Sequence, residues 1–165
     1  MLFMPRLAVI FDLGGVLFSY NPCPTVGAAL CLPVGQNPFT PIDSNVRLVR
    51  QLSQAQDITG QRLAELYVLS NFSLHAYTRL RQQHQELFDF FDGVAVSGLT
   101  RHVKPDPRAY HWLLNEYGLR VNECIFIDDT ADYVNTAQLI GMRGIIYSDS
   151  VNLEHELQAL MVKPF

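Results

Sequence analysis

The sequence predicts an α/β protein in which helices cover both faces of a parallel sheet, a three-layer Rossmann-like arrangement. Short apolar segments alternate along the chain with helical segments, and this order is typical of parallel sheets. The first apolar run, Leu7 to Phe11, is followed at once by Asp12. A run that is apolar at every position indicates a strand buried on both faces, and a carboxylate after it is expected at the strand's carboxyl end. In open α/β sheets that edge is where ligands bind.

Length and composition indicate a single globular domain over residues 1–165. Of the 165 residues, 48% are hydrophobic and 17% are charged, and the net charge of −4 disfavours binding to nucleic acid or an anionic membrane. No apolar run is long enough to span a bilayer. Asp12 interrupts the apolar N-terminal run, so we expect a cytoplasmic protein without a signal peptide. The three cysteines show no metal-ligand spacing, and Cys124 is expected in the core.

Five strands are predicted, each from an apolar run that ends at polar or turn-forming residues. They cover residues 7–13, 66–70, 94–97, 124–128 and 144–147. Helices are predicted between them and after the last strand, over residues 44–54, 74–87, 107–117, 131–140 and 152–161.

The helix limits follow from capping signals. The first helix has Asp43 or Ser44 as a candidate N-cap. The helix over 107–117 has proline in its first turn and Gly118 just after its end. Asp106 is expected to cap that helix, and Gly141 ends the helix over 131–140.

Residues 19–41 depart from this alternation because they contain five prolines and two glycines. This composition excludes a long helix. The segment is expected to be a short Pro-rich surface loop or, since it follows the Asp12 turn directly, a lid over the site.

Four predicted strand ends carry residues suited to chemistry. In chain order these are Asp12, then Ser70-Asn71, then Lys104 in a Lys-Pro-Asp-Pro turn, and then Asp128-Asp129. In a parallel sheet these ends share one edge, which gathers three carboxylates, a hydroxyl group and an ammonium group. The carboxylates repel one another unless a cation lies between them, and such an oxygen-rich site suits Mg²⁺. Lys104 has the charge needed to hold a phosphate.

Each of these motifs also has a purely structural explanation. Asp12 can initiate a turn, Ser70-Asn71 can end a strand, and Lys104 can be a solvated surface residue. One of Asp128 and Asp129 can cap the following helix. Capping needs only one carboxylate, however, so the second remains without a structural role.

Together, in this order, the four motifs resemble those of the haloacid dehalogenase (HAD) superfamily of hydrolases, subfamily I-like with a truncated cap. The resemblance covers nearly the whole chain except residues 19–41. It implies a phosphatase in which Asp12 is the nucleophile that forms an aspartyl-phosphate intermediate. It also implies that Lys104 neutralises charge and that Ser70 and the backbone of Asn71 bind the phosphoryl oxygens. The implied Mg²⁺ ligands are Asp12, the carbonyl group of Gly14, Asp129 and Asp128.

The chain departs from the family pattern at Gly14, where typical HAD phosphatases carry a second aspartate that acts as general acid and base. Such catalysis typically contributes about 10²–10⁴-fold, so we expect slow turnover of esters with poor leaving groups. Tyr133 is a second departure, since many relatives carry Asn or Asp there. One alternative is therefore a weakly active or inactive HAD-like module that binds a phosphorylated ligand or a protein. A 2-haloacid dehalogenase is less favoured because Asp128-Asp129 would repel a haloacid.

The interval between the first two motifs is too short for a full helical cap. Asp12 and Ser70 lie 58 positions apart (70 − 12), and this interval must also hold a helix and a strand. We expect an open site that accepts a phosphorylated small molecule or macromolecule, or that a protein partner or a second copy covers.

Overall fold

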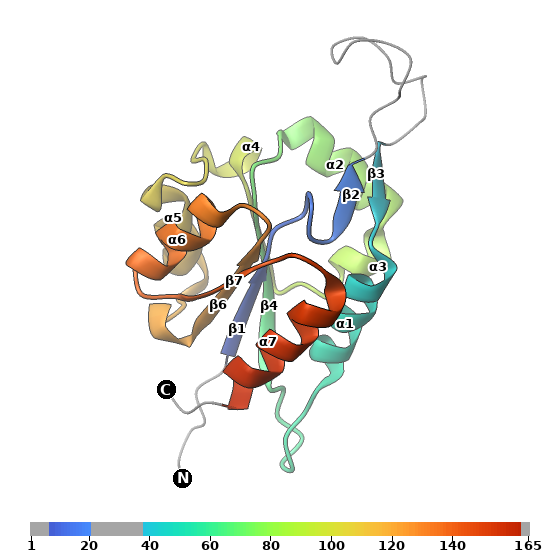
Figure 1. Ribbon diagram of the computed structural model, residues 1–165. Helices are drawn as coiled ribbons and strands as arrows, with labels where there is room; N and C mark the ends of the chain where they lie inside the picture. The colour runs from blue at the N-terminus through green and yellow to red at the C-terminus, as the bar shows by residue number, and fades with distance from the viewer. Residues whose placement is uncertain (1–6, 21–37, 163–165) are drawn as a thin grey trace.

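A five-stranded parallel sheet runs through the centre of the protein (Figure 1). This computed structural model describes residues 7–20 and 38–162. The strand order is β5-β4-β1-β6-β7, and all four neighbouring pairs are parallel. The strands are β1 (Leu7–Phe11), β4 (Ala64–Ser70), β5 (Gly93–Val96), β6 (Cys124–Asp128) and β7 (Arg143–Ile146). The α/β fold class predicted from the sequence is therefore confirmed.

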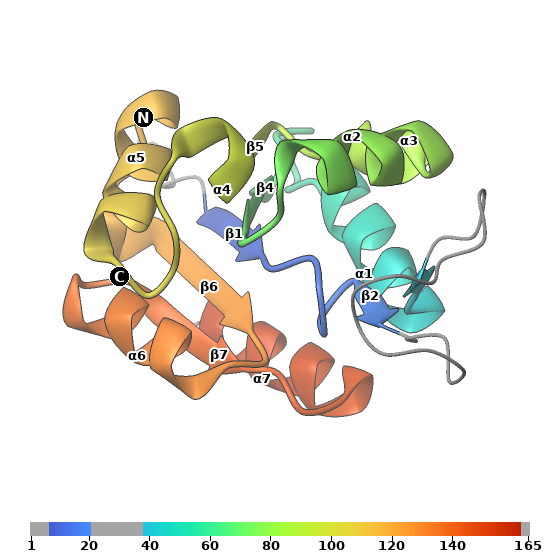
Figure 2. The ribbon, with the colours of Figure 1, turned by 90° about the horizontal axis from the view of Figure 1, so that it is seen from above.

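Helices cover both faces of this sheet, which gives three layers. One face carries α1 (Asp43–Gln54), α2 (Leu74–Gln83), α3 (Gln85–Phe88) and α7 (Ser150–Val162). The other carries α5 (Pro107–Tyr117) and α6 (Ala131–Leu139). The short helix α4 (Ser97–Thr100) follows β5, and a 3₁₀ turn (Val121–Glu123) precedes β6. Seen from above, the sheet lies between the two helical layers (Figure 2).

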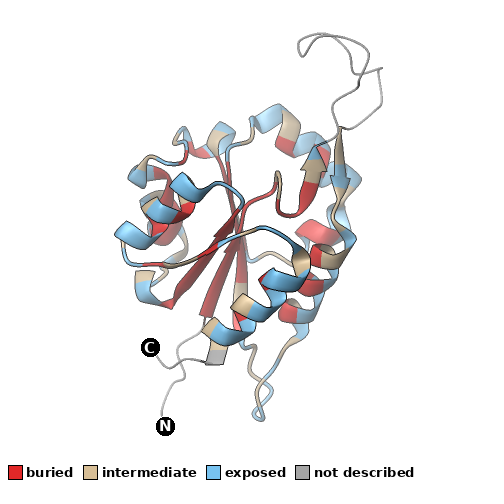
Figure 3. Cartoon of the chain, in the orientation of Figure 1, coloured by how far each residue is buried: buried red, intermediate tan, exposed pale blue. Residues whose placement is uncertain are grey.

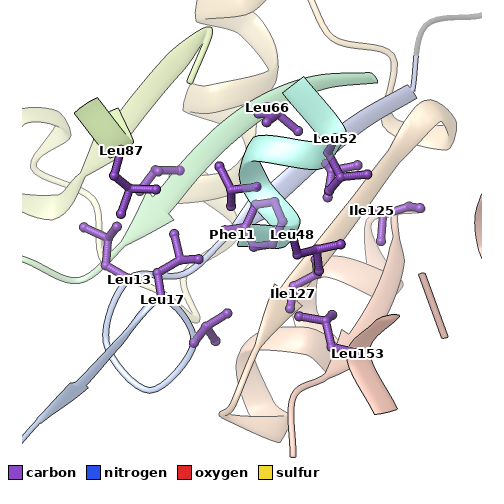
Figure 4. Close-up of a cluster of buried hydrophobic side chains, with 14 of the residues drawn as sticks. Phe11, Leu13, Leu17, Leu48, Leu52, Leu66, Leu87, Ile125, Ile127 and Leu153 are labelled. Carbon is purple, nitrogen blue, oxygen red and sulfur yellow. The ribbon is translucent and has the colours of Figure 1, made fainter. Parts of the chain in front are cut away.

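The central strand β1 is buried on both faces, as its uninterrupted apolar sequence predicts. Leu7, Val9 and Phe11 pack toward α1, whereas Ala8 and Ile10 pack toward α5. The sheet forms the buried interior of the protein (Figure 3). Figure 4 shows Phe11 surrounded by side chains of α1 and β6. A strand held this firmly on both sides fixes the position of the residue that follows it.

Helix ends agree with the sequence in α5 and differ in α1. The carboxylate of Asp106 accepts a hydrogen bond of 2.9 Å from the backbone N–H of Arg108. Gly118 ends α5 in the left-handed region, with φ of 63°. Helix α1 begins at Asp43, so its N-cap position is Ile42, which offers no side-chain acceptor. The prediction of Asp43 or Ser44 as N-cap was therefore wrong by one or two residues.

Two segments differ from their predicted structure. The predicted helix over 74–87 is broken at His84, where φ is −128° and ψ is 40°, and it forms α2 and α3. The imidazole of His84 lies against the ring of Phe18, with 5.2 Å between centroids. Because this contact fixes His84 toward the core, tertiary packing overrides the continuous helical pattern.

The Pro-rich stretch 19–41 was predicted as a loop throughout, and this is wrong at its ends. Strands β2 (Phe18–Tyr20) and β3 (Phe39–Pro41) pair antiparallel as a separate two-stranded sheet. Residues 21–37, which include Cys23 and Cys31, lie outside the described residues. Cys124 is buried with a free thiol, as expected. Within 7–20 and 38–162, no helix is both long and apolar enough to cross a membrane.

Candidate active site

The turn after β1 places Asp12 at the carboxyl edge of the sheet. Asp12 is buried, and its backbone N–H donates a hydrogen bond of 2.9 Å to the carbonyl group of Ile127 in β6. Gly15 adopts φ of +83°, which glycine accepts without strain, and its N–H donates to the carbonyl group of Phe18. The chain can therefore turn sharply while Asp12 stays registered with the sheet.

Lys104 lies between two of the carboxylates. Its Nζ atom is 2.9 Å from Asp12 Oδ1 and 2.5 Å from Asp128 Oδ2, and its side chain is only 1% exposed. The ammonium group also faces two aromatic rings, those of Phe126 at 5.3 Å and Tyr133 at 5.1 Å. A buried ammonium group is stable only with such partners, so the pairing holds Lys104 in one geometry.

The side chain of Asn71 fixes the backbone of Lys104. Asn71 Nδ2 donates to the Lys104 carbonyl oxygen at 2.9 Å, and the Lys104 N–H donates to Asn71 Oδ1 at 2.8 Å. Asn71 Nδ2 also lies 3.4 Å from the hydroxyl oxygen of Tyr133. The Ser70-Asn71 motif and the Lys104 motif are thus joined by the side-chain amide of Asn71, whose N–H group donates and whose oxygen accepts. Asn71 therefore has a positioning role that the sequence did not indicate.

Asp12, Asp128 and Asp129 form a cluster of carboxylates with the geometry of a metal site. Each offers one oxygen, and these atoms lie within 4.8 Å of one another. Asp128 is held by its second oxygen, which accepts the backbone N–H of Thr130 at 2.9 Å. Asp129 is exposed and approaches the Gly15 backbone so closely that a β-carbon there would lie 2.0 Å from Asp129 Oδ2. A side chain at this position would have to displace the third carboxylate from its place in the cluster.

The electrostatics of the cluster favour an added cation. Burial, followed by the nearby charge of Asp12, raises the pKa of Asp128 to about 6, and Lys104 opposes this shift. Three carboxylates and one ammonium group carry a formal charge of −2. A divalent cation would balance this charge, and carboxylate oxygen is what Mg²⁺ prefers. The residues present therefore fit a magnesium ion.

The place of the usual acid–base aspartate is bounded by an aromatic ring. A β-carbon at Gly14 would lie 3.4 Å from Cε2 of Phe72. Within the described residues, the atoms next to this position therefore belong to an apolar ring and carry no titratable group.

The structure brings together most of the residues predicted from the four motifs. Asp12, Lys104 and Asp128 are in contact, and Asp129 completes the carboxylate cluster. Ser70 is buried at the carboxyl end of β4, beside these groups in the sheet order. Gly14 lies in the turn after Asp12, where it bridges to Phe18.

Sequence reasoning missed two contacts of the site, the Phe72 ring beside Gly14 and the Tyr133 ring over Lys104. Tyr133 lies in the first turns of α6, four residues after Asp129. That nearness was the available signal for its role. Phe72 had no signal beyond following Asn71.

Comparison with known proteins defines the class of this chain. Residues 29–141 match the family model of haloacid dehalogenase-like hydrolases, and the chain belongs to this family. Its fold is similar to that of a HAD family enzyme from Bacteroides thetaiotaomicron in complex with magnesium. That match has a TM-score of 0.72 and 16% identity, and it covers 94% of this chain and 100% of the other.

Relatives in sequence include phosphatases. The chain is 28% identical to the sesquiterpene phosphatase astK of Aspergillus oryzae over 190 residues, which covers 93% of this chain and 96% of the relative. It is 39% identical to Phosphatase MT3486 of Mycobacterium tuberculosis over 83 residues, 50% of this chain and 38% of the relative. The protein is therefore a HAD-family hydrolase with phosphatases among its relatives.

Proposed function

We propose that this hydrolase is a Mg²⁺-dependent phosphatase that acts through an aspartyl-phosphate intermediate on Asp12. The observation that carries the proposal is the ion pairing of one buried lysine with both Asp12 and Asp128 beside a third carboxylate. Phosphatases among the relatives support phosphate esters as substrates.

In the first step, a carboxylate oxygen of Asp12 attacks phosphorus and the bond from phosphorus to the alcohol oxygen breaks. The leaving oxygen takes its proton from water, since Gly14 has no acidic side chain. In the second step water attacks the acyl phosphate, releases inorganic phosphate and restores the Asp12 carboxylate. Through both steps Lys104 supplies positive charge to the nucleophile and the phosphoryl oxygens.

A magnesium ion held by Asp12, Asp128, Asp129 and the Gly14 carbonyl group would stabilise negative charge on the phosphoryl oxygens. Ser70 and the backbone of Asn71 would donate hydrogen bonds to the same oxygens. Asn71 also holds Lys104 in place through the two hydrogen bonds to its backbone.

A second candidate function is a HAD-like module that binds a phosphorylated ligand with little or no turnover. The observation that favours it is the aromatic ring of Phe72 beside Gly14, where an acid and base would otherwise stand. Such a module would bind inorganic phosphate in the presence of Mg²⁺ but would not hydrolyse phosphate esters.

The test is hydrolysis of p-nitrophenyl phosphate, which has a good leaving group, with and without Mg²⁺. The wild type should turn over only with Mg²⁺, and Asp12→Asn should abolish turnover. Glu116→Gln is the matched control because it removes an exposed carboxylate on α5. Equal activity of wild type and Asp12→Asn would refute the proposal. Binding of phosphate without turnover would establish the second candidate instead.

A further inference from the structure

Three aromatic side chains lead from the catalytic turn to the β2–β3 hairpin. The ring of Phe72 lies 4.9 Å from that of Phe39, and Phe39 lies 5.3 Å from Tyr20, measured between centroids. Phe72 is the inner end of this aromatic track, beside Gly14, and Tyr20 is the outer end. The track therefore begins beside Gly14, which follows the proposed nucleophile Asp12 by two residues.

The inner end of the track is held rigidly. The carbonyl oxygen of Phe72 accepts hydrogen bonds from the backbone N–H of Gly98 at 2.9 Å and from the Ser97 hydroxyl at 3.1 Å. Helix α4, which begins at Ser97, thereby fixes the segment after β4. The backbone that carries the Phe72 ring is therefore held in place beside Gly14.

The outer end of the track is open to solvent. Tyr20 is 57% exposed, and Phe39 and Phe72 are half-buried. Phe39 and Phe72 pack against the core on one side, so the exposed parts of these two rings and the exposed ring of Tyr20 offer apolar surface that a ligand could cover with a gain in hydrophobic free energy. Because the track adjoins Gly14, a group attached to a phosphoryl group at Asp12 would lie against it.

The geometry points to a substrate whose alcohol portion is apolar and lies along Phe72, Phe39 and Tyr20. This inference rests on the proposed phosphatase function and deepens it by naming the substrate class. The phosphoryl group is bound by charge at Asp12 and Lys104, and the hydrocarbon group is selected by aromatic contact. Gly14 supplies no general acid. Binding energy from the apolar portion would therefore favour the turnover of one class of ester over others.

Affinity for alkylphosphonates tests the subsite without requiring turnover. Methylphosphonate and octylphosphonate carry the same charged group and differ only in the chain, and isothermal titration calorimetry in Mg²⁺ gives both dissociation constants. Each methylene that is fully buried contributes about fourfold, so octylphosphonate should bind at least about tenfold more tightly to the wild type. Equal affinities would overturn the inference.

Variants on the track locate the gain. Tyr20→Ala should reduce the ratio of the two affinities about fivefold, whereas Tyr20→Phe should preserve it. Leu139→Ala removes an 87% exposed side chain on α6 and is the matched control, which should leave the ratio unchanged. Phe39→Ala should act as Tyr20→Ala does. An unchanged ratio in Tyr20→Ala and in a folded Phe39→Ala would also overturn the inference.

The outcome is separate from that of the proposed function. Absence of p-nitrophenyl phosphate hydrolysis with a retained preference for octylphosphonate would refute the phosphatase and leave the apolar subsite standing. Hydrolysis without a chain-length preference would support the phosphatase and refute the apolar subsite.

Discussion

Replacing Gly15 by alanine should weaken magnesium binding through Asp129. The new β-carbon would lie 2.0 Å from Asp129 Oδ2, whereas non-bonded heavy atoms rest roughly 3.5 Å apart. The carboxylate must therefore move by about 1.5 Å along that direction. Productive metal–ligand distances tolerate only about 0.2 Å.

The expected loss can be estimated from this displacement. Misplacing one ligand should lower the affinity for Mg²⁺ about 10–100-fold, or about 1.4–2.7 kcal/mol. Alanine at φ of +83° adds backbone strain of about 1–2 kcal/mol, which lowers the free energy of unfolding. The two effects are separable because only the first involves the metal.

Calorimetry with MgCl₂ and urea unfolding measure the two effects. Gly60→Ala is the matched control, since Gly60 has φ of +82° and its nearest contact is 3.9 Å away. It should lose similar stability and keep its Mg²⁺ affinity. In an Asp129→Ala background, Gly15→Ala should cause no further loss of affinity. A Gly15→Ala affinity within about twofold of wild type would refute this account of the site.

Three further predictions concern Lys104, Asn71 and Cys124. Lys104→Met leaves Asp12 and Asp128 without their shared ammonium group, so the free energy of unfolding in urea should fall by about 3–5 kcal/mol in the absence of Mg²⁺; an unchanged value would contradict the pairing. Asn71→Ala removes both hydrogen bonds to the Lys104 backbone and should lower kcat/KM for an aryl phosphate by about 10–100-fold; an unchanged kcat/KM would show that the ion pairs alone position Lys104 and would contradict the positioning role of Asn71. Burial raises the pKa of the Cys124 thiol to about 12, so above about pH 8.5 the unfolded chain loses this proton first, and stability falls as the pH rises toward about 12. Cys124→Ala should reduce the fall between about pH 8.5 and about pH 10 by about 1.5 kcal/mol in urea titrations, and an identical fall in both proteins would exclude this linkage.

The sheet and the placement of its motifs could be predicted because they follow from local signals. An apolar run that stops at Asp12 or Asp128 indicates both a buried strand and the edge at which it ends. Parallel pairing of β1 and β6 then brings Asp12 and Asp128 to the same edge. These inferences need only the period of the pattern and the rule for parallel sheets. The motif pattern also predicted that Lys104 follows a strand directly, and this is wrong because α4 lies between it and β5; its side chain reaches the two carboxylates from the turn after α4.

Features that depend on tertiary contacts could not be predicted in this way. The break between α2 and α3 arises where His84 meets Phe18, which is distant in sequence. The use of the Asn71 side chain depends on the backbone of Lys104, 33 residues later. Both contacts become visible only when segments that no local pattern relates are placed side by side.

The hairpin formed by β2 and β3 has a consequence for engineering. Because Ser19 pairs with Thr40, and Leu17 accepts a hydrogen bond from the N–H of Ile42, the chain departs and returns at one anchored point. The entropy of closing a loop grows slowly, by roughly 0.6 kcal/mol for each doubling of its length. Segments of quite different length could therefore be exchanged between the two strands without displacing the turn that carries Asp12. The paired strands β2 and β3 thus hold the chain in place at this edge of the sheet, while segments that determine specificity could be exchanged between them.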